Sequence, residues 1–202
     1  MPTAHIAVYD TLADWEPGHL LAELRTGRFT GTPFDVVTVA ETTAPVTTMG
    51  GVRVLPDVAP ADVDPGASAL LVLPGADLWD AGGGDAFAAA ARRWLAAGVP
   101  VAAICGATFG LARAGLLDTR RHTSAAPEYL AASGYRGGVH YVHTRAVADG
   151  GLVTAGPQSP VQFATATLGA LGLAASPILA AYEAVFADGD ASAYPALMAA
   201  AA

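Results

Sequence analysis

The sequence predicts a single α/β domain of the flavodoxin-like, doubly wound type, with a mostly parallel sheet between helix layers. Two short apolar runs, Leu70–Leu73 and Val101–Ile104, are typical of strands buried on both faces. The alanine-rich segment 85–97 between them favours a helix, so the three segments form a βαβ unit with parallel strands. A length of 202 residues, 53% of them hydrophobic, suits one domain over 1–202 with a full core.

The remaining elements continue this alternation of strands and helices. We expect strands at 5–9 and 34–40, a helix over 17–27, a short strand or hairpin arm at 50–55, and a helix over 108–114. Pro17 suits the first position of its helix. Beyond Leu117 the sequence predicts a short strand at 120–124, a helical turn at 128–133, a hairpin of 141–148 with 152–154, and helices at 160–171, 176–187 and 190–202.

The composition argues against several classes of protein. The formal net charge is −8, and all 10 basic residues are arginine. Because the sequence has no lysine, imine-forming chemistry and P-loop nucleotide hydrolysis lack their key residue. An acidic chain without a basic stripe is also a poor nucleic-acid binder. No apolar run is long enough to span a bilayer and no secretory signal is evident, so we expect a cytoplasmic protein without a membrane partner.

The single cysteine is the strongest candidate for a reactive group. Cys105 follows the strand Val101–Ile104 and precedes a helical pattern, so we expect it at a strand-to-helix corner. The small residues Gly106 and Ala107 allow a sharp turn and the close approach of a substrate, as in a nucleophile elbow. A helix N-terminus favours thiolate over thiol, and we therefore expect a lowered thiol pKa. The alternative is that Cys105 is a small buried apolar side chain.

Two further loops are expected beside Cys105, because the carboxyl ends of parallel strands meet at one edge of the sheet. One loop follows the first strand and carries Glu16, and the other is Gly75-Ala76-Asp77. Glu16 adjoins the start of a predicted helix, so it can also be interpreted as a helix N-cap. The ligand crevice is expected where these loops converge.

Several separated segments resemble the ThiJ/PfpI superfamily. They are Ala13-Asp-Trp-Glu16, Leu73-Pro-Gly-Ala76, the segment 103–124 around Cys105, and Asp149-Gly-Gly-Leu-Val-Thr-Ala-Gly156. The resemblance implies that Glu16 is a protonated carboxylic acid that donates a hydrogen bond to the Cys105 sulfur. Thiolate and carboxylate side by side repel, so the pair would keep one proton, and its apparent pKa values belong to the pair. The resemblance also implies a homodimer.

The same resemblance implies further groups around the sulfur. Backbone N–H groups of Gly75, Ala76 and Gly106 would form an oxyanion hole for a carbonyl oxygen, the alternative for each being an ordinary turn residue.

The acid-base histidine of the superfamily has no direct counterpart in this sequence. Gly106 follows the cysteine, and Ala125 stands at the position of the family's later histidine. His122 lies three residues earlier. It either reaches Cys105 as an acid-base group or has a structural role at a strand end.

The other histidines do not predict a metal site. His140 and His143 have an odd spacing, which in a strand directs side chains to opposite faces. His19 lies one turn beyond Glu16 and is interpreted as a solvated helix position. We therefore expect no metal and no cofactor.

The resemblance implies a cofactor-free cysteine enzyme acting on a small electrophile, with glyoxalase III-like or deglycase-like chemistry on α-oxoaldehydes. An isocyanide hydratase-like hydro-lyase is an alternative, although those relatives resemble one another in having aspartate where this sequence has Glu16. A non-enzymatic redox sensor or stress-response protein, with Cys105 oxidised to a sulfinic acid held by Glu16, is a second alternative. The same residues serve all three functions, so the sequence leaves them open.

Overall fold

A computed structural model describes residues 1–200 of the chain and contains a six-stranded sheet in the order β2-β1-β5-β6-β8-β7. Neighbouring strands run parallel except for β7, which is antiparallel to β8. A two-stranded antiparallel hairpin, β3 with β4, stands apart from this sheet. The strands are β1 (Thr3–Ala7), β2 (Asp35–Val39), β3 (Val46–Thr47), β4 (Arg53–Val54), β5 (Leu70–Leu73), β6 (Val101–Ile104), β7 (Ala146–Asp149) and β8 (Leu152–Ala155).

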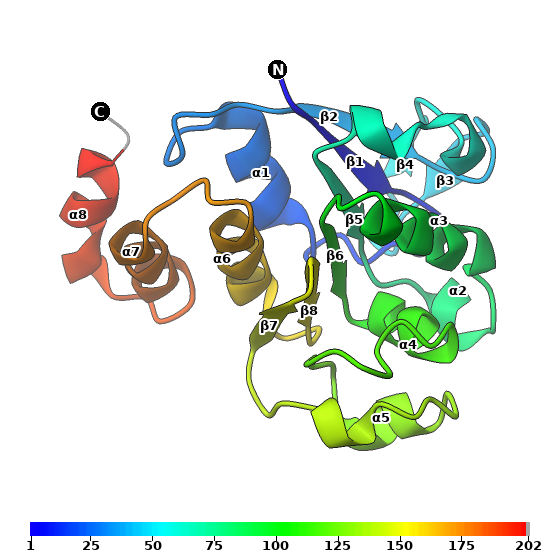
Figure 1. The fold of residues 1–202 in the computed structure, drawn as a ribbon. Coiled ribbons are helices and arrows are strands. Elements are labelled where there is room, and N and C mark those ends of the chain that lie inside the picture. The colour runs from blue at the N-terminus through cyan, green and yellow to red at the C-terminus, as the bar shows by residue number, and fades with distance from the viewer. Residues whose placement is uncertain (201–202) are drawn as a thin grey trace.

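Helices cover both faces of the sheet, as predicted for a doubly wound fold (Figure 1). Alternate residues of a buried strand point to opposite faces, so Leu71 packs with helices α3 and α4, whereas Leu70 packs with α1 and α6. The helices are α1 (Gly18–Thr26), α2 (Asp77–Asp80), α3 (Asp85–Ala96), α4 (Gly106–Arg113), α5 (Pro127–Ala131), α6 (Pro160–Ala170), α7 (Ser176–Phe186) and α8 (Tyr194–Ala199).

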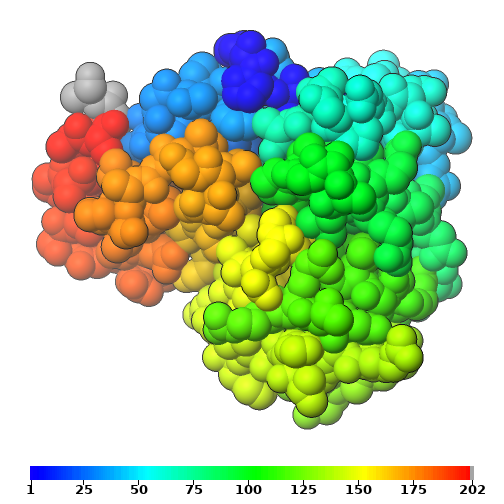
Figure 2. All heavy atoms as spheres, in the orientation of Figure 1, coloured from blue at the N-terminus to red at the C-terminus, as the bar shows by residue number. Residues whose placement is uncertain are grey.

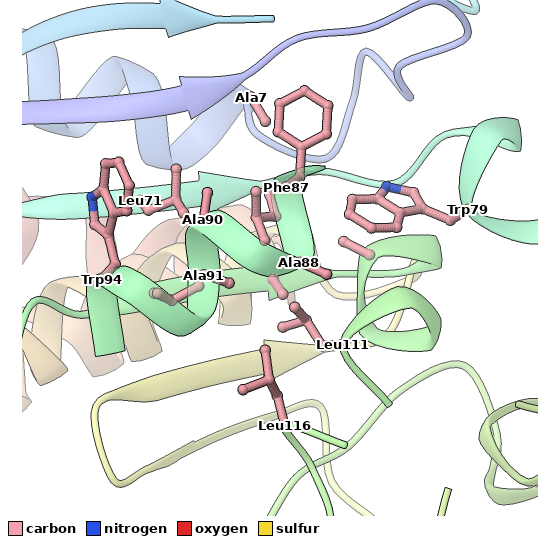
Figure 3. Close-up of a cluster of buried hydrophobic side chains, with 14 of the residues drawn as sticks. Ala7, Leu71, Trp79, Phe87, Ala88, Ala90, Ala91, Trp94, Leu111 and Leu116 are labelled. Carbon is pink, nitrogen blue, oxygen red and sulfur yellow. The ribbon is translucent and has the colours of Figure 1, made fainter. Parts of the chain in front are cut away.

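The core beneath α3 is built from aromatic and small side chains. Phe87, Ala91 and Trp94 recur at helical spacing on the buried face of α3. In Figure 3 the Trp79 ring lies to one side of Phe87 and the Trp94 ring lies near Leu71. Trp79 and Phe87 have ring centroids 6.4 Å apart, so α2 is fixed against the start of α3.

The C-terminal helices pack beside the N-terminal part of the chain. Figure 2 shows the orange C-terminal region against the lighter blue N-terminal residues. Tyr182 of α7 donates a hydrogen bond to the buried carboxylate of Glu23, at 3.1 Å. Arg28 pairs with the same carboxylate, so the charge of Glu23 is neutralised inside the structure.

Several element boundaries differ from the sequence predictions. The segment 120–124 forms no named strand, and His122 makes an isolated bridge with Tyr141. The first strand ends before residues 8 and 9, because its pairing with β2 ends at Ala7 opposite Val39. The helix expected over 108–114 begins earlier, at Gly106. The expected helix 190–202 is a 3₁₀ turn (Ala191–Ala193) followed by α8, while residues 201–202 lie outside the described part.

In the described residues 1–200, each helix is too short or too polar to cross a bilayer.

Candidate active site

Cys105 lies at the predicted corner between β6 and α4. Its backbone has φ 57° and ψ −126°, a positive φ that a non-glycine residue rarely adopts. The corner is held by hydrogen bonds from the Cys105 N–H to Ala155 O and from the Thr108 N–H to Cys105 O, both 3.0 Å. Cys105 is only partly buried, and its side chain packs against the core beneath α1 and α6. Strained backbone supported in this way is a feature of nucleophile elbows, and the prediction of one is confirmed.

Glu16 is completely buried in the loop between β1 and α1. Its Oε2 accepts a hydrogen bond from the Gly75 N–H at 2.6 Å, whereas its Oε1 has no hydrogen-bond partner among the described residues. The side chain does not cap α1, whose N-cap is Pro17 without a side-chain hydrogen bond. A helix cap is therefore not the role of Glu16. A buried carboxyl group with a free oxygen is instead available for proton transfer.

Gly75 brings Glu16 and Cys105 together. A Cβ added to Gly75 would lie 2.8 Å from Glu16 Oε2 and 3.0 Å from Cys105 Sγ. Only glycine leaves room for the two side chains to meet over the backbone at this position. The neighbouring loops are tied together here as well, because the Ala13 N–H donates to Gly75 O at 3.0 Å. The predicted convergence of the three loops is thus present in the structure.

Burial controls the protonation of this pair. It raises the pKa of Glu16 from 4.5 to about 7, although the Gly75 N–H and the Cys105 thiol oppose part of the change. Burial and, after it, the negative charge of Glu16 raise the pKa of Cys105 to about 12. The expected lowering of the thiol pKa is therefore wrong. A helix N-terminus favours the thiolate, but here that effect is smaller than desolvation and the repulsion by a neighbouring carboxylate.

The backbone donors around the sulfur differ in availability. The Gly106 N–H hydrogen-bonds to Cys105 and favours its charged form. The Gly75 N–H is already bonded to Glu16, so the prediction that Gly75 contributes to an oxyanion hole is wrong. Ala76 is extended and nearly buried, and its carbonyl accepts the Trp79 N–H at 3.2 Å. The Gly106 N–H is bonded to the cysteine itself rather than to another residue, so Gly106 and Ala76 remain the candidate donors to a substrate oxygen.

His122 is buried and both of its ring nitrogens are occupied. Its Nδ1 lies 2.7 Å from Arg120 O, and its Nε2 lies 3.1 Å from the Tyr135 hydroxyl. The ring also packs edge-on against Tyr135 and Tyr141. His122 therefore has the structural role, and the alternative that it is an acid-base partner of Cys105 is wrong. The decisive partner, Tyr135, follows it by 13 residues, and no sequence pattern connects the two.

The remaining histidines also have contacts other than a metal. His19 lies 3.0 Å from the Tyr182 hydroxyl, on the half-buried side of α1 rather than in solvent. His143 packs edge-on against Tyr141. Within residues 1–200, the structure contains no group of three or more potential metal-ligating His, Cys, Asp and Glu side chains.

Two polar residues that the sequence analysis missed lie near Cys105. The Tyr129 hydroxyl of α5 donates to Asp80 Oδ1 of α2 at 2.6 Å. Asp80 adds to the negative field that raises the pKa of the Cys105 thiol, and a charge on Cys105 raises the pKa of Tyr129 in turn. Asp80 closely follows the loop at the carboxyl end of β5, a position that could have identified it.

Comparison with known proteins identifies sequence relatives. The family model described as "DJ-1/PfpI family" matches residues 2–170. A protein of Bacillus subtilis named "Uncharacterized protease YoaZ" is 36% identical over 169 residues, covering 81% of this chain and 80% of that protein.

Solved structures show the same fold. A thiJ/pfpI family protein from Bacillus anthracis matches with 34% identity and a TM-score of 0.90, covering 99% of this chain and 98% of the other. The DJ-1 superfamily protein Atu0886 from Agrobacterium tumefaciens matches with 34% identity and a TM-score of 0.84, covering 94% of this chain and 100% of the other. Drosophila melanogaster DJ-1beta, at 23% identity and a TM-score of 0.69, shares the fold over 90% of this chain and 95% of its own.

Proposed function

The chain belongs to the DJ-1/PfpI family, and we propose that it is a cysteine-dependent enzyme that acts on small α-oxoaldehydes such as methylglyoxal. The observation that carries this proposal is the buried carboxyl group of Glu16 beside Cys105, with a pKa raised to about 7. A base with a pKa near the working pH is effective in proton transfer. The residues named in the proposed reaction all belong to this chain.

The first step forms a bond between Cys105 and the aldehyde carbon. At neutral pH the thiol keeps its proton, because its pKa is raised to about 12. Ionised Glu16 takes that proton as the sulfur attacks and the carbonyl π electrons move onto oxygen. The oxygen then receives the same proton back from Glu16, which gives a neutral hemithioacetal and restores the carboxylate. The Gly106 N–H, and that of Ala76, would stabilise the charge developing on the oxygen.

The raised thiol pKa favours an enzyme over the redox sensor. Sensor cysteines are readily oxidised because they are thiolates at neutral pH, and burial beside Glu16 opposes that state. The isocyanide hydratase alternative uses the same thiol and carboxyl group, so it is included in the test. We place the protein in the cytoplasm, where a reducing environment keeps a single cysteine free.

The experiment measures consumption of methylglyoxal and glyoxal by the purified protein with and without a chelator. Turnover that survives chelation and is lost in Cys105→Ser and Glu16→Ala supports the proposal. Preferential consumption of an isocyanide assigns the hydratase instead. Cleavage of casein that depends on Cys105 assigns a protease. If peroxide adds two oxygens to Cys105 while no substrate of these classes is consumed, the protein is a redox sensor.

A further inference from the structure

We propose that Tyr129, held by Asp80, is the second proton-transfer group of the Cys105 site and performs the acid-base role for which the sequence offers no histidine. The inference rests on the proposed function and deepens it. His122 does not serve this role because both of its nitrogens are occupied elsewhere. Tyr129 and Asp80 form a hydrogen bond of 2.6 Å between α5 and α2.

Packing against α4 places both residues beside the cysteine. Phe109 follows Cys105 by one helical turn, and its ring centroid lies 5.1 Å from that of Tyr129. On the other side, a Cβ added to Gly106 would lie 3.3 Å from the Trp79 Cβ, so the residue after the cysteine contacts the residue before Asp80. Figure 1 shows α2, α4 and α5 grouped at the same end of the molecule. The hydrogen bond between Tyr129 and Asp80 therefore joins two helices that meet around the start of α4.

Solvent access and charge agree with a role for Tyr129 at the Cys105 site. Tyr129 is half-buried, Asp80 is exposed and Cys105 is partly exposed, so solvent reaches all three residues. Burial is the main cause of the raised pKa of both Cys105 and Tyr129; the charge of Asp80 adds to it at Cys105, and the charges of Asp80, Cys105 and Glu16 add to it at Tyr129. The four groups therefore lie close enough for their charges to interact.

The chemistry follows from the direction of the hydrogen bond. The Tyr129 hydroxyl donates a hydrogen bond to Asp80, which leaves the lone pairs of the phenol oxygen free to accept a proton from the substrate. In the hemithioacetal on Cys105, C1 is the former aldehyde carbon and C2 is the neighbouring carbonyl carbon. The C1–H bond breaks, and its proton passes to Tyr129 while the tyrosine proton passes to Asp80. The electron pair of that bond forms the C1–C2 double bond of an enediolate. Return of the proton to C2, with loss of the C1 hydroxyl proton to the C2 oxygen, gives a thioester. Carbon C1 is oxidised and C2 reduced, so no external oxidant is needed.

Water then cleaves the thioester, restoring the Cys105 thiol and releasing a 2-hydroxy acid. Through the relay, Tyr129 never has to become a phenolate, which the surrounding negative charges disfavour. Tyr129 is the catalytic residue in this scheme because it contacts the substrate. Asp80 is a positioning residue that also receives the proton.

The experiment compares Tyr129→Phe, which keeps the ring packed on Phe109, with the control Tyr141→Phe. Tyr141 is also half-buried and makes one hydroxyl hydrogen bond, to Ser124 O at 3.2 Å. We expect Tyr129→Phe to lower kcat for methylglyoxal by about 10²-fold or more, the usual effect of losing an acid-base group. Methylglyoxal should still protect Cys105 of this variant from iodoacetamide, because hemithioacetal formation needs only Cys105 and Glu16. The control should retain turnover.

Two further measurements separate the inference from the proposed function. Substrate deuterated at C1 should slow turnover of the wild type and of any residual Tyr129→Phe activity, because the C1–H bond breaks in the relay step. Asp80→Asn should lower the apparent pKa for alkylation of Cys105, independently of turnover. Unchanged kcat in Tyr129→Phe overturns the inference while leaving the proposed function intact. A wild type that neither consumes methylglyoxal nor is protected by it overturns the proposed function, and the relay with it.

Discussion

Replacing Glu16 by glutamine should change how the stability of the protein depends on pH. The native carboxyl group has its pKa raised from 4.5 to about 7, mainly by burial, so the folded protein binds this proton more tightly than the unfolded chain does. The resulting contribution to stability is complete below pH 4.5 and is lost as the pH rises through 7. Glutamine has no proton to release, so the variant lacks this dependence.

The magnitude follows from the two pKa values. A tenfold difference in proton affinity is worth about 1.4 kcal/mol, so a pKa raised from 4.5 to about 7 is worth about 3 kcal/mol when the group is fully buried, as Glu16 is. The free energy of unfolding of the wild type relative to Glu16→Gln should therefore fall by about 3 kcal/mol between about pH 4 and 8. Across this range Cys105 keeps its proton in the native state and contributes little.

The assay is urea denaturation of both proteins at intervals of half a pH unit. Glu128→Gln serves as the control, since it removes an exposed carboxylate from the chain of net charge −8. A difference between wild type and Glu16→Gln that stays constant with pH, or grows as the pH rises, would show that the native carboxyl group is not held protonated by burial. The role of Glu16 as a base near neutral pH would then be refuted.

Four other experiments test different parts of the site. Glu16→Gln should lower the pKa of the Cys105 thiol, because it removes a neighbouring negative charge, and the pH profile of iodoacetamide alkylation measures the change. In the wild type, kcat/KM for methylglyoxal should rise through about pH 7 as Glu16 ionises, and a profile flat from pH 5 to 9 would contradict this. Gly75→Ala should abolish turnover by separating Glu16 from Cys105, whereas Gly138→Ala, with open space at its Cβ, should not. His122→Ala should lower the free energy of unfolding by about 2 to 4 kcal/mol in urea titrations, because it empties a buried site and leaves Tyr135 without its partner; loss of turnover in a folded variant would restore His122 to the chemistry.

The sequence was most informative where one short segment decides the structure. The strand Val101–Ile104 is fully buried, so its apolar run is continuous, and Cys105 follows it directly with two small residues after it. The location of Gly75 and Glu16 at the same edge of the sheet could be predicted, because the loops after parallel strands converge there. These predictions needed only local patterns and the sheet topology.

The predictions that failed depend on the three-dimensional surroundings of a side chain. The pKa of Cys105 is set by burial and by Glu16, which outweigh the helix N-terminus visible in the sequence. The role of His122 is set by Tyr135, a contact that forms only when the two segments pack together. Tyr129 was missed because α5 reaches the site through its packing on Phe109, and a tyrosine in a short helix carries no pattern of its own.

The charges around the thiol explain how reactivity and protection can coexist in one site. Burial, and after it the charges of Glu16 and Asp80, oppose ionisation of Cys105, and a thiol that keeps its proton is expected to be oxidised slowly. Nevertheless, Glu16 can accept the thiol proton at the moment of attack, because its own pKa is about 7. The sulfur thus becomes a strong nucleophile only when an electrophile is in contact with it. If the proposed function holds, uncharged carbonyl compounds should react faster than anionic ones, because the carboxylates that raise the pKa of the thiol would repel an anion.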